Sequence, residues 1–233
     1  MNTVIELTAA DGFRFPVYVA QPASAPRGAV VVLQEIFGLN AHIREVCDGF
    51  AADGFLAVAP ATFHRVKPGV ELGYGPDDVN AGRELKAAVE ALAAPGVMSD
   101  VQAAVDHAAQ ASGCKVGVLG YCWGGLLTWR AAALCQGLAA AVPYYGGGMT
   151  IGTEPQRVPR CPVLAHFGTQ DMGIPMDTVD AFTAAQAGKQ PPVQVMTWDA
   201  NHGFNCNHRG NWQAGAAAAA REQTLKFLAQ QLA

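Results

Sequence analysis

Cys122 has the sequence surroundings of a reactive thiol. It lies in Gly120-Tyr121-Cys122-Trp123-Gly124-Gly125, which follows the apolar run at residues 115–120 and precedes a segment of helical periodicity. A G-x-C-x-G segment between a strand and a helix is typical of a nucleophile elbow in which sulfur replaces oxygen. We expect the elbow to need glycine at 120 and 124, because side chains there would collide with neighbouring backbone. The partial positive charge of a helix N-terminus favours the thiolate.

A structural alternative to this elbow is a buried cysteine in a glycine-rich, phosphate-type turn. Neither a Walker motif nor G-x-G-x-x-G occurs in the sequence, so a nucleotide site has little support.

A cysteine nucleophile needs a general base and a carboxylate that orients the base. Asp171 ends Gly168-Thr169-Gln170-Asp171, just after the apolar run at 162–167, and His202 follows the run at 193–198. The order nucleophile, acid, histidine is that of α/β hydrolases, so the sequence predicts a Cys122-His202-Asp171 triad. Taken alone, Asp171 is equally typical of a turn or cap, and a loop histidine is usually only solvated.

A carboxylate at Glu35 ends the apolar run of residues 29–36, where a charge is costly without a partner. We expect Glu35 to accept a hydrogen bond from the Cys122 thiol and to keep this thiol neutral until substrate arrives. The backbone N–H groups of Ile36 and Trp123 would then form an oxyanion hole. The alternative is a Glu35 that pairs with Arg44 or caps the helix near residue 40.

These residues require strands that alternate with helices. The D-G dipeptide at 11–12, between two apolar runs, predicts a hairpin or a pair of edge strands, and later runs without alternation suit strands buried on both faces. Ser99 and Gln102 have the spacing of a capping box, and Gly113 suits a helix C′ position. The expected strands are 4–7, 13–19, 29–36, 55–59, 115–120, 140–144, 162–167 and 193–198, and the expected helices are 40–52, 77–93, 99–112, 124–136, 175–187 and 212–231. This order predicts a mostly parallel sheet with helices on both sides, and the chemistry collects at the strands' carboxyl ends.

The composition narrows the class of protein. With 51% apolar and 15% charged residues, the 233-residue chain can bury a large core, and we expect one domain over residues 1–233. A net charge of −4 without a block of like charges argues against a nucleic-acid partner. There is no apolar run of membrane-spanning length, the first twelve residues lack the basic and apolar segments typical of a signal peptide, and the six cysteines lack a C-x-x-C pair. We therefore expect a cytoplasmic monomer with free thiols and no membrane partner.

Four motifs together give the chain a family resemblance. They are Gln34-Glu35-Ile36-Phe37-Gly38, Gly120-Tyr121-Cys122-Trp123-Gly124-Gly125, Gly168-Thr169-Gln170-Asp171 and Asn201-His202-Gly203-Phe204. With them the chain resembles the dienelactone hydrolase (carboxymethylenebutenolidase) family over nearly its whole length. The resemblance implies an α/β-hydrolase fold and the opening of a lactone or related ester without a cofactor. It also implies a Cys122, His202 and Asp171 triad, and a Glu35 that bonds the resting thiol and helps to activate it.

One position departs from the family pattern. Family members hold the substrate carboxylate with arginines, one of them four residues after the histidine, and Cys206 stands at that position here. Arg209 lies three residues further on, and Arg83 falls near the other family arginine. Losing one arginine should weaken the binding of anionic substrates by about 1.5–3 kcal/mol. The substrate of this protein is therefore open to being a different lactone or an ester. Aromatic residues that could line an apolar pocket, or equally belong to the core, are Phe37, Phe63, Trp123, Tyr145 and Phe204.

Two other functions compete with this hypothesis. His202, Cys206 and His208 form an H-x3-C-x-H cluster of candidate zinc ligands, although no fourth ligand is evident. A chain that kept the fold but lost turnover would instead be a binding or sensing module.

Overall fold

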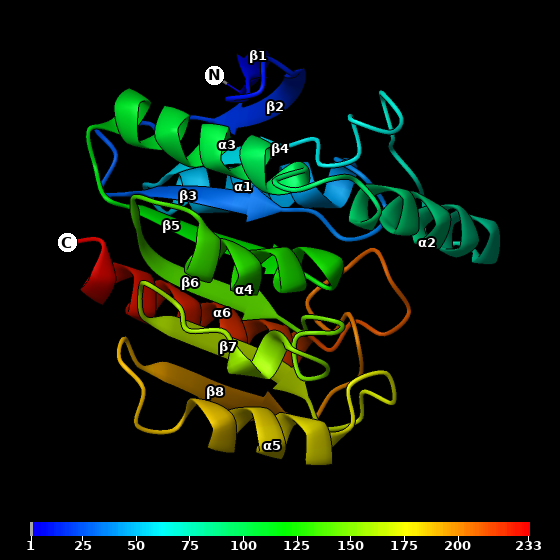
Figure 1. Ribbon diagram of the computed structural model, residues 1–233. Helices are drawn as coiled ribbons and strands as arrows, with labels where there is room; N and C mark the ends of the chain where they lie inside the picture. The colour runs from blue at the N-terminus through cyan, green and yellow to red at the C-terminus, as the bar shows by residue number, and fades with distance from the viewer. Residues whose placement is uncertain (1) are drawn as a thin grey trace.

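The fold is built on a central eight-stranded sheet, shown by a computed structural model that describes residues 2–233 (Figure 1). The strand order is β1-β2-β4-β3-β5-β6-β7-β8. β2 runs antiparallel to β1 and β4, and the other neighbouring strands are parallel. The strands are β1 (Thr3–Thr8), β2 (Arg14–Ala20), β3 (Ala29–Leu33), β4 (Leu56–Pro60), β5 (Val116–Tyr121), β6 (Leu138–Tyr144), β7 (Val163–Gly168) and β8 (Val193–Trp198). The predicted mostly parallel sheet and its α/β-hydrolase architecture are confirmed.

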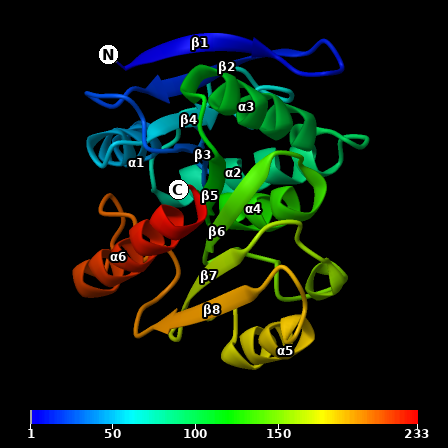
Figure 2. The same ribbon diagram turned by 90° about the vertical axis from the view of Figure 1, so that its left-hand side faces the viewer.

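Helices cover both faces of this sheet. Figure 2 shows α1 and α6 on one face and α3, α4 and α5 on the other, with the sheet seen nearly edge-on between them. The helices are α1 (Ala41–Ala52), α2 (Pro76–Glu90), α3 (Val97–Ser112), α4 (Trp123–Leu134), α5 (Met176–Gln186) and α6 (Ala214–Gln231), and a short 3-10 turn covers Glu154–Gln156. None of the helices within residues 2–233 has the length and apolar character needed to cross a bilayer.

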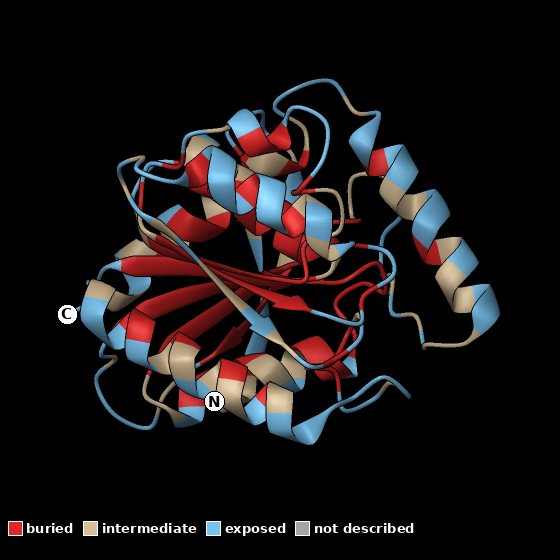
Figure 3. Cartoon of the chain, turned by 90° about the horizontal axis from the view of Figure 1, so that it is seen from below, coloured by how far each residue is buried: buried red, intermediate tan, exposed pale blue. Residues whose placement is uncertain are grey.

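Burial in the core explains why the inner strands are unbroken apolar runs in the sequence. Every residue of β3, β4, β5 and β7 is buried, because helices shield both faces of these strands. In Figure 3 the central strands are uniformly buried, whereas the surrounding helices alternate between buried and exposed residues. The helices thus present one apolar side to the sheet and one polar side to solvent.

Helix α2 lies beyond the carboxyl ends of the parallel strands (Figure 1). It packs closely on the loop after β3, because a Cβ atom at Gly82 would lie 2.3 Å from the Ile36 carbonyl oxygen. This contact brings one face of α2 over the end of the sheet where chemistry is expected.

Several predicted boundaries are wrong by two or three residues, and two of them change the interpretation of a residue. The strand expected over residues 29–36 ends at Leu33, where its pairing with Gly120 ends, so Glu35 lies on a loop. The helix expected from a capping box at Ser99 begins at Val97, after Gly96 with a φ of 52°. Ser99 is therefore inside the helix, and the buried carboxylate of Asp100 binds Arg65 at 2.7 Å. Gly113 ends this helix in the left-handed conformation, as predicted.

Candidate active site

Cys122 occupies a strained turn between β5 and α4. Its φ of 55° is unusual for a residue with a side chain, and such strain costs about 1–3 kcal/mol. The turn is possible only with small neighbours: a Cβ atom at Gly120 would lie 2.3 Å from the Gly124 carbonyl oxygen, and one at Gly124 would lie 2.3 Å from that of Leu33. The expected need for glycine at both positions is confirmed. The turn leaves Cys122 partly exposed at the N-terminus of α4.

His202 and Asp171 form a close pair next to this turn. The His202 Nδ1 atom lies 2.6 Å from Asp171 Oδ2, although the two residues come from loops after β8 and β7. Asp171 is 4% exposed, and its other oxygen accepts a hydrogen bond from the Gly173 N–H at 2.8 Å. Asp171 is thus both the turn residue and the histidine partner that the sequence suggested as alternatives.

Backbone contacts explain why these two loops meet. The Thr169 N–H donates to the Trp198 carbonyl at 2.8 Å, and the Gln170 N–H donates to the Ala200 carbonyl at 3.0 Å. Gly168 permits the approach, since a Cβ atom there would lie 2.3 Å from the Ala200 oxygen. The loop that carries Asp171 is therefore fixed against the loop that carries His202.

The electrostatics link His202 to Cys122 as well. Burial disfavours a charged imidazole, but the electrostatic interaction with Cys122 and hydrogen bonding to Asp171 and Cys122 outweigh burial and raise the pKa of His202 to about 10. The Tyr145 ring lies edge-on to the His202 ring, 5.1 Å between centroids, and supports it from one side.

Glu35 does not bond the Cys122 thiol, contrary to the prediction. One of its oxygens, Oε1, accepts a hydrogen bond from Arg209 Nη1 at 2.9 Å, and Oε2 has no partner. A guanidinium gives a charge-assisted bond to a buried carboxylate that a thiol cannot match. The alternative interpretations are also wrong, because Arg44 pairs with Glu71 and the side chain of Asn40 caps α1.

A pocket of about 200 Å³ opens at this place. Cys122 and His202 line it together with both residues of the expected oxyanion hole and with three cationic side chains. Its lining residues are Ile36, Phe37, Val79, Arg83, Lys86, Cys122, Trp123, Gly147, His202 and Arg209. As the first residue of α4, Trp123 has an N–H that no carbonyl of the helix accepts, so it is free to bind an oxygen in the pocket.

Comparison with known proteins places the chain in a family. The model of the dienelactone hydrolase family matches residues 15–232. The chain belongs to the dienelactone hydrolase family. The carboxymethylenebutenolidases of Pseudomonas putida and Pseudomonas knackmussii are each 35% identical to it over 230 residues, which cover 97% of this chain and 95% of theirs. The protein is a hydrolase of the dienelactone hydrolase type.

Solved structures agree with this family assignment. A Klebsiella pneumoniae crystal structure assigned as a dienelactone hydrolase is 28% identical, with a TM-score of 0.82 and 99% of both chains covered. A dienelactone hydrolase-like promiscuous phosphotriesterase from metagenomic libraries has a TM-score of 0.78 at 22% identity, over 100% of this chain and 99% of that one. The latter likeness shows the α/β-hydrolase fold alone.

Three of the expected aromatic pocket residues do not line the pocket of this hydrolase. Tyr145 and Phe204 are fully buried, with 5.1 Å between their ring centroids, and Tyr145 acts as a support for His202. Phe63 is also buried and stacks on Trp123 at 4.9 Å. Among the predicted substrate-binding residues, Phe37 and Arg83 line the pocket.

The sequence analysis missed Val79 and Lys86, which face the same pocket from α2. Together with Arg83 they have the spacing i, i+4 and i+7, which places them on one face of a helix. That periodicity was visible in the sequence, but it could not show that this face lies over the ends of the strands. Arg209 was considered, and the structure places it in the pocket although Cys206 holds the family's arginine position.

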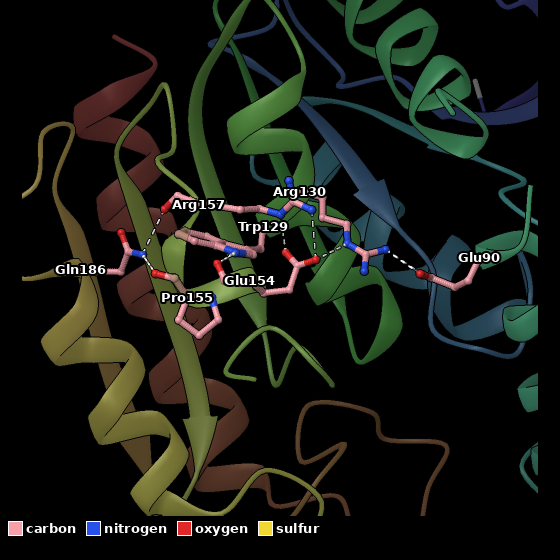
Figure 4. A network of polar contacts seen from close by, with 7 residues as sticks. All are labelled: Glu90, Trp129, Arg130, Glu154, Pro155, Arg157 and Gln186. Atoms are coloured by element: carbon pink, nitrogen blue, oxygen red, sulfur yellow. Dashed lines mark hydrogen bonds and ion pairs between the residues drawn. The ribbon is translucent and has the colours of Figure 1, made fainter. Parts of the chain in front are cut away.

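A chain of ion pairs fixes α2 and the start of α4 to each other. Glu90, at the end of α2, accepts a hydrogen bond from Trp123 Nε1 at 2.8 Å and binds Arg130 Nη1 through both of its oxygens, at 2.9 and 2.7 Å. Figure 4 shows how Arg130 continues the chain to Glu154, which also binds Arg157. The network holds the cationic face of α2 over the elbow.

The candidate zinc ligands of the alternative hypothesis have separate partners. His202 binds Asp171, His208 binds Glu45 at 2.8 Å, and Cys206 lies beside Glu35 and His42. Within residues 2–233, the groups of ligand atoms close enough to share a cation are Glu35, His42 and Cys206, and His42, Glu45 and His208. Neither group includes His202, so the alternative H-x3-C-x-H arrangement does not form a shared cation site.

Proposed function

We propose that the hydrolase opens its substrate through a thioester on Cys122, with His202 and Asp171 completing a catalytic triad. The observation that supports this proposal most strongly is the single pocket lined by Cys122 and His202, in which His202 is already held by Asp171 at 2.6 Å. Nucleophile, base and orienting acid are thus supplied by three loops at one edge of the sheet.

In the first half of the reaction, the Cys122 thiolate attacks the carbonyl carbon of the lactone or ester. The N–H groups of Ile36 and Trp123 bind the oxygen that becomes negative. The bond between the acyl carbon and the leaving oxygen then breaks, and the leaving oxygen takes the proton of the His202 imidazolium. The raised pKa of His202 suits this role, because the proton is available at neutral pH.

In the second half, water attacks the thioester and gives its proton to His202. The product leaves as the acid and releases its remaining proton to solvent, and the Cys122 thiolate and His202 imidazolium return. Asp171 keeps Nδ1 occupied throughout, which directs the other ring nitrogen toward the reacting atoms. The acyl–oxygen bond of the substrate is replaced by the acyl–oxygen bond of the product, so no external oxidant or cofactor is required.

The three cations of the pocket favour a substrate that carries a carboxylate. Arg83 and Lys86 approach from α2, and Arg209 approaches from the loop after β8. Arg209 replaces the arginine that Cys206 displaces, and Glu35 holds it in place. An anionic lactone is therefore the proposed substrate class. This proposal agrees with the name of the two Pseudomonas relatives, carboxymethylenebutenolidase.

Cys122→Ala tests the nucleophile directly. The variant should lose hydrolysis of an anionic lactone by at least about 10³-fold, because neither a thiolate nor a thioester can form. Cys114→Ala is the matched control: this thiol is also partly exposed, but its sulfur contacts the Pro26 carbonyl, and it does not line the pocket. Full turnover by Cys122→Ala would end the proposal.

A further inference from the structure

A second cluster of reactive side chains lies behind the proposed active site. Glu35 comes from the loop after β3, His42 from the first turn of α1 and Cys206 from the loop after β8. The three are 1%, 2% and 0% exposed. One ligand atom from each lies within 4.8 Å of the other two. Segments distant in sequence thus bring a carboxylate, an imidazole and a thiol together in the interior.

Two of the three side chains have polar atoms without partners, whereas the Cys206 thiol lies beside the Tyr74 hydroxyl. Glu35 Oε2 has no hydrogen bond, and neither ring nitrogen of His42 has one, although the Asn207 side chain lies near the ring. Buried polar atoms are nearly always paired, because leaving them without a partner is costly. Glu35 Oε2 and the unprotonated ring nitrogen of His42 therefore offer electron pairs that a cation can accept, whereas the other ring nitrogen carries a hydrogen.

We propose that Glu35, His42 and Cys206 form a binding site for Zn²⁺. A thiolate, an imidazole and a carboxylate are the ligand types that zinc prefers, and three protein ligands leave the fourth position for water. Zinc bonds of about 2.0–2.3 Å place tetrahedral ligands about 3.3–3.8 Å apart, so the present separations need to contract by at most about 1.5 Å.

Protons and charges balance at the proposed site. Burial and the charge of Glu35 raise the pKa of the Cys206 thiol to about 11, so zinc must displace one proton from it to solvent. Burial lowers the pKa of His42, whereas the charges of Glu35 and Glu45 raise it and that of His208 lowers it further, so His42 ligates without losing a proton. Zn²⁺ in exchange for one proton adds one positive charge. Arg209 can keep its bond to Glu35 Oε1 while the metal takes Oε2.

One of the three proposed ligands borders a cavity that is open to solvent. His42 borders a cavity of about 360 Å³ that opens between α1, α6 and the loop after β8. Glu45, Asn207 and Arg221 lie on the same cavity wall. A cation can therefore reach His42 without passing through the pocket of Cys122, which has a separate lining.

A competing arrangement uses His42 with Glu45 and His208. These ligand atoms are also within 4.8 Å of one another, but Glu45 and His208 are more exposed and already bind each other at 2.8 Å. Their bond leaves less unpaired capacity than Glu35 and Cys206 offer. The two arrangements make different predictions for variants.

Direct metal binding tests the proposal without any measurement of turnover. Chelator-treated protein should bind one Zn²⁺ per chain in calorimetry, with an affinity that rises about tenfold per pH unit between about pH 6 and 8, because one proton is released. Co²⁺ in place of Zn²⁺ should show thiolate-to-metal charge-transfer absorption. Cys206→Ser should abolish that absorption and weaken binding at least about 100-fold, and His42→Gln should weaken it to a similar extent.

Three control variants separate the possible outcomes. Cys122→Ala and Cys161→Ser should both keep the binding and the cobalt spectrum, as should His208→Gln. Loss of binding in Cys122→Ala would place the metal at the proposed nucleophile, and loss in His208→Gln but not in Cys206→Ser would place it in the exposed group. Either result, or the absence of stoichiometric binding by the folded wild-type protein, would overturn the proposal. Circular dichroism establishes that each variant is folded.

Discussion

The Glu35–Arg209 pair makes an asymmetric prediction for stability. Glu35 is 1% exposed, whereas the Arg209 side chain is 18% exposed and reaches the pocket. Arg209→Gln strands a buried carboxylate, and breaking a buried pair in this way costs about 3–5 kcal/mol. Glu35→Gln leaves a cation that water in the pocket can reach, so we expect a loss of only about 1 kcal/mol.

The double variant sharpens this comparison. Glu35→Gln in the Arg209→Gln background removes the stranded charge and should recover about 2 kcal/mol of the lost free energy of unfolding. For a chain of 233 residues, a loss of 3 kcal/mol corresponds to a decrease in Tm of about 6–12 °C.

Urea unfolding followed by circular dichroism measures these differences for the wild type, both single variants and the double variant. Equal losses in the two single variants, or a change below about 0.5 kcal/mol in Arg209→Gln, would refute the argument from burial. The same variants report on substrate charge: Arg209→Gln should raise KM for an anionic lactone far more than for a neutral one.

Three further predictions concern α2 and the core. Gly82→Ala should lower kcat/KM by about tenfold or more, because the added Cβ atom would lie 2.3 Å from the Ile36 carbonyl oxygen. Gly210→Ala is the control and should have no effect, since no atom lies within 4 Å of its Cβ position. Equal activities of the two variants would contradict the close contact. Glu90→Ala should lower kcat/KM by about fivefold or more. Glu90→Gln should lower kcat/KM less, since its amide oxygen can still accept the hydrogen bond from Trp123 Nε1. Identical losses in the two variants would argue against a role for the Trp123 hydrogen bond. Burial lowers the pKa of His166 from 6.5 to about 3, so the unfolded chain binds a proton that the folded protein does not, and stability falls as pH decreases below about 6.5. Urea unfolding should show about 2 kcal/mol less stability at pH 5 than at pH 7 from this residue, and a His166→Gln variant with an unchanged pH dependence would show that another group is responsible.

Local patterns in the sequence predicted most of the fold. The apolar runs of β3, β5 and β7 are long enough and continuous enough to mark buried strands, and Asp11-Gly12 marks the hairpin of β1 and β2. The capping box at Ser99 failed because Gly96 allows an earlier start and because Asp100 has a tertiary partner in Arg65. A short-range signal was overridden there by a contact that the local sequence cannot show.

The sequence predicted those residues of the site that directly follow a parallel strand. The ends of parallel strands share one edge, so Cys122 and the Asp171–His202 pair could be placed together from strand order alone. The partner of Glu35 could not be predicted, because Arg209 lies 174 positions away and competes with the thiol through charge. The sequence also could not predict which face of α2 lines the pocket, because the position of this helix depends on the contact of Gly82 with Ile36.

Mass spectrometry of the intact protein, quenched during turnover of a slowly hydrolysed ester, tests the central claim most directly. We predict that the wild-type protein gains the mass of one acyl group, that peptide mapping places it on Cys122, and that hydroxylamine removes it as it does other thioesters. Asp171→Asn should accumulate the same adduct more slowly. Hydrolysis at the wild-type rate with an acyl group on another residue, or with no adduct under conditions where deacylation is rate-limiting, would contradict the account.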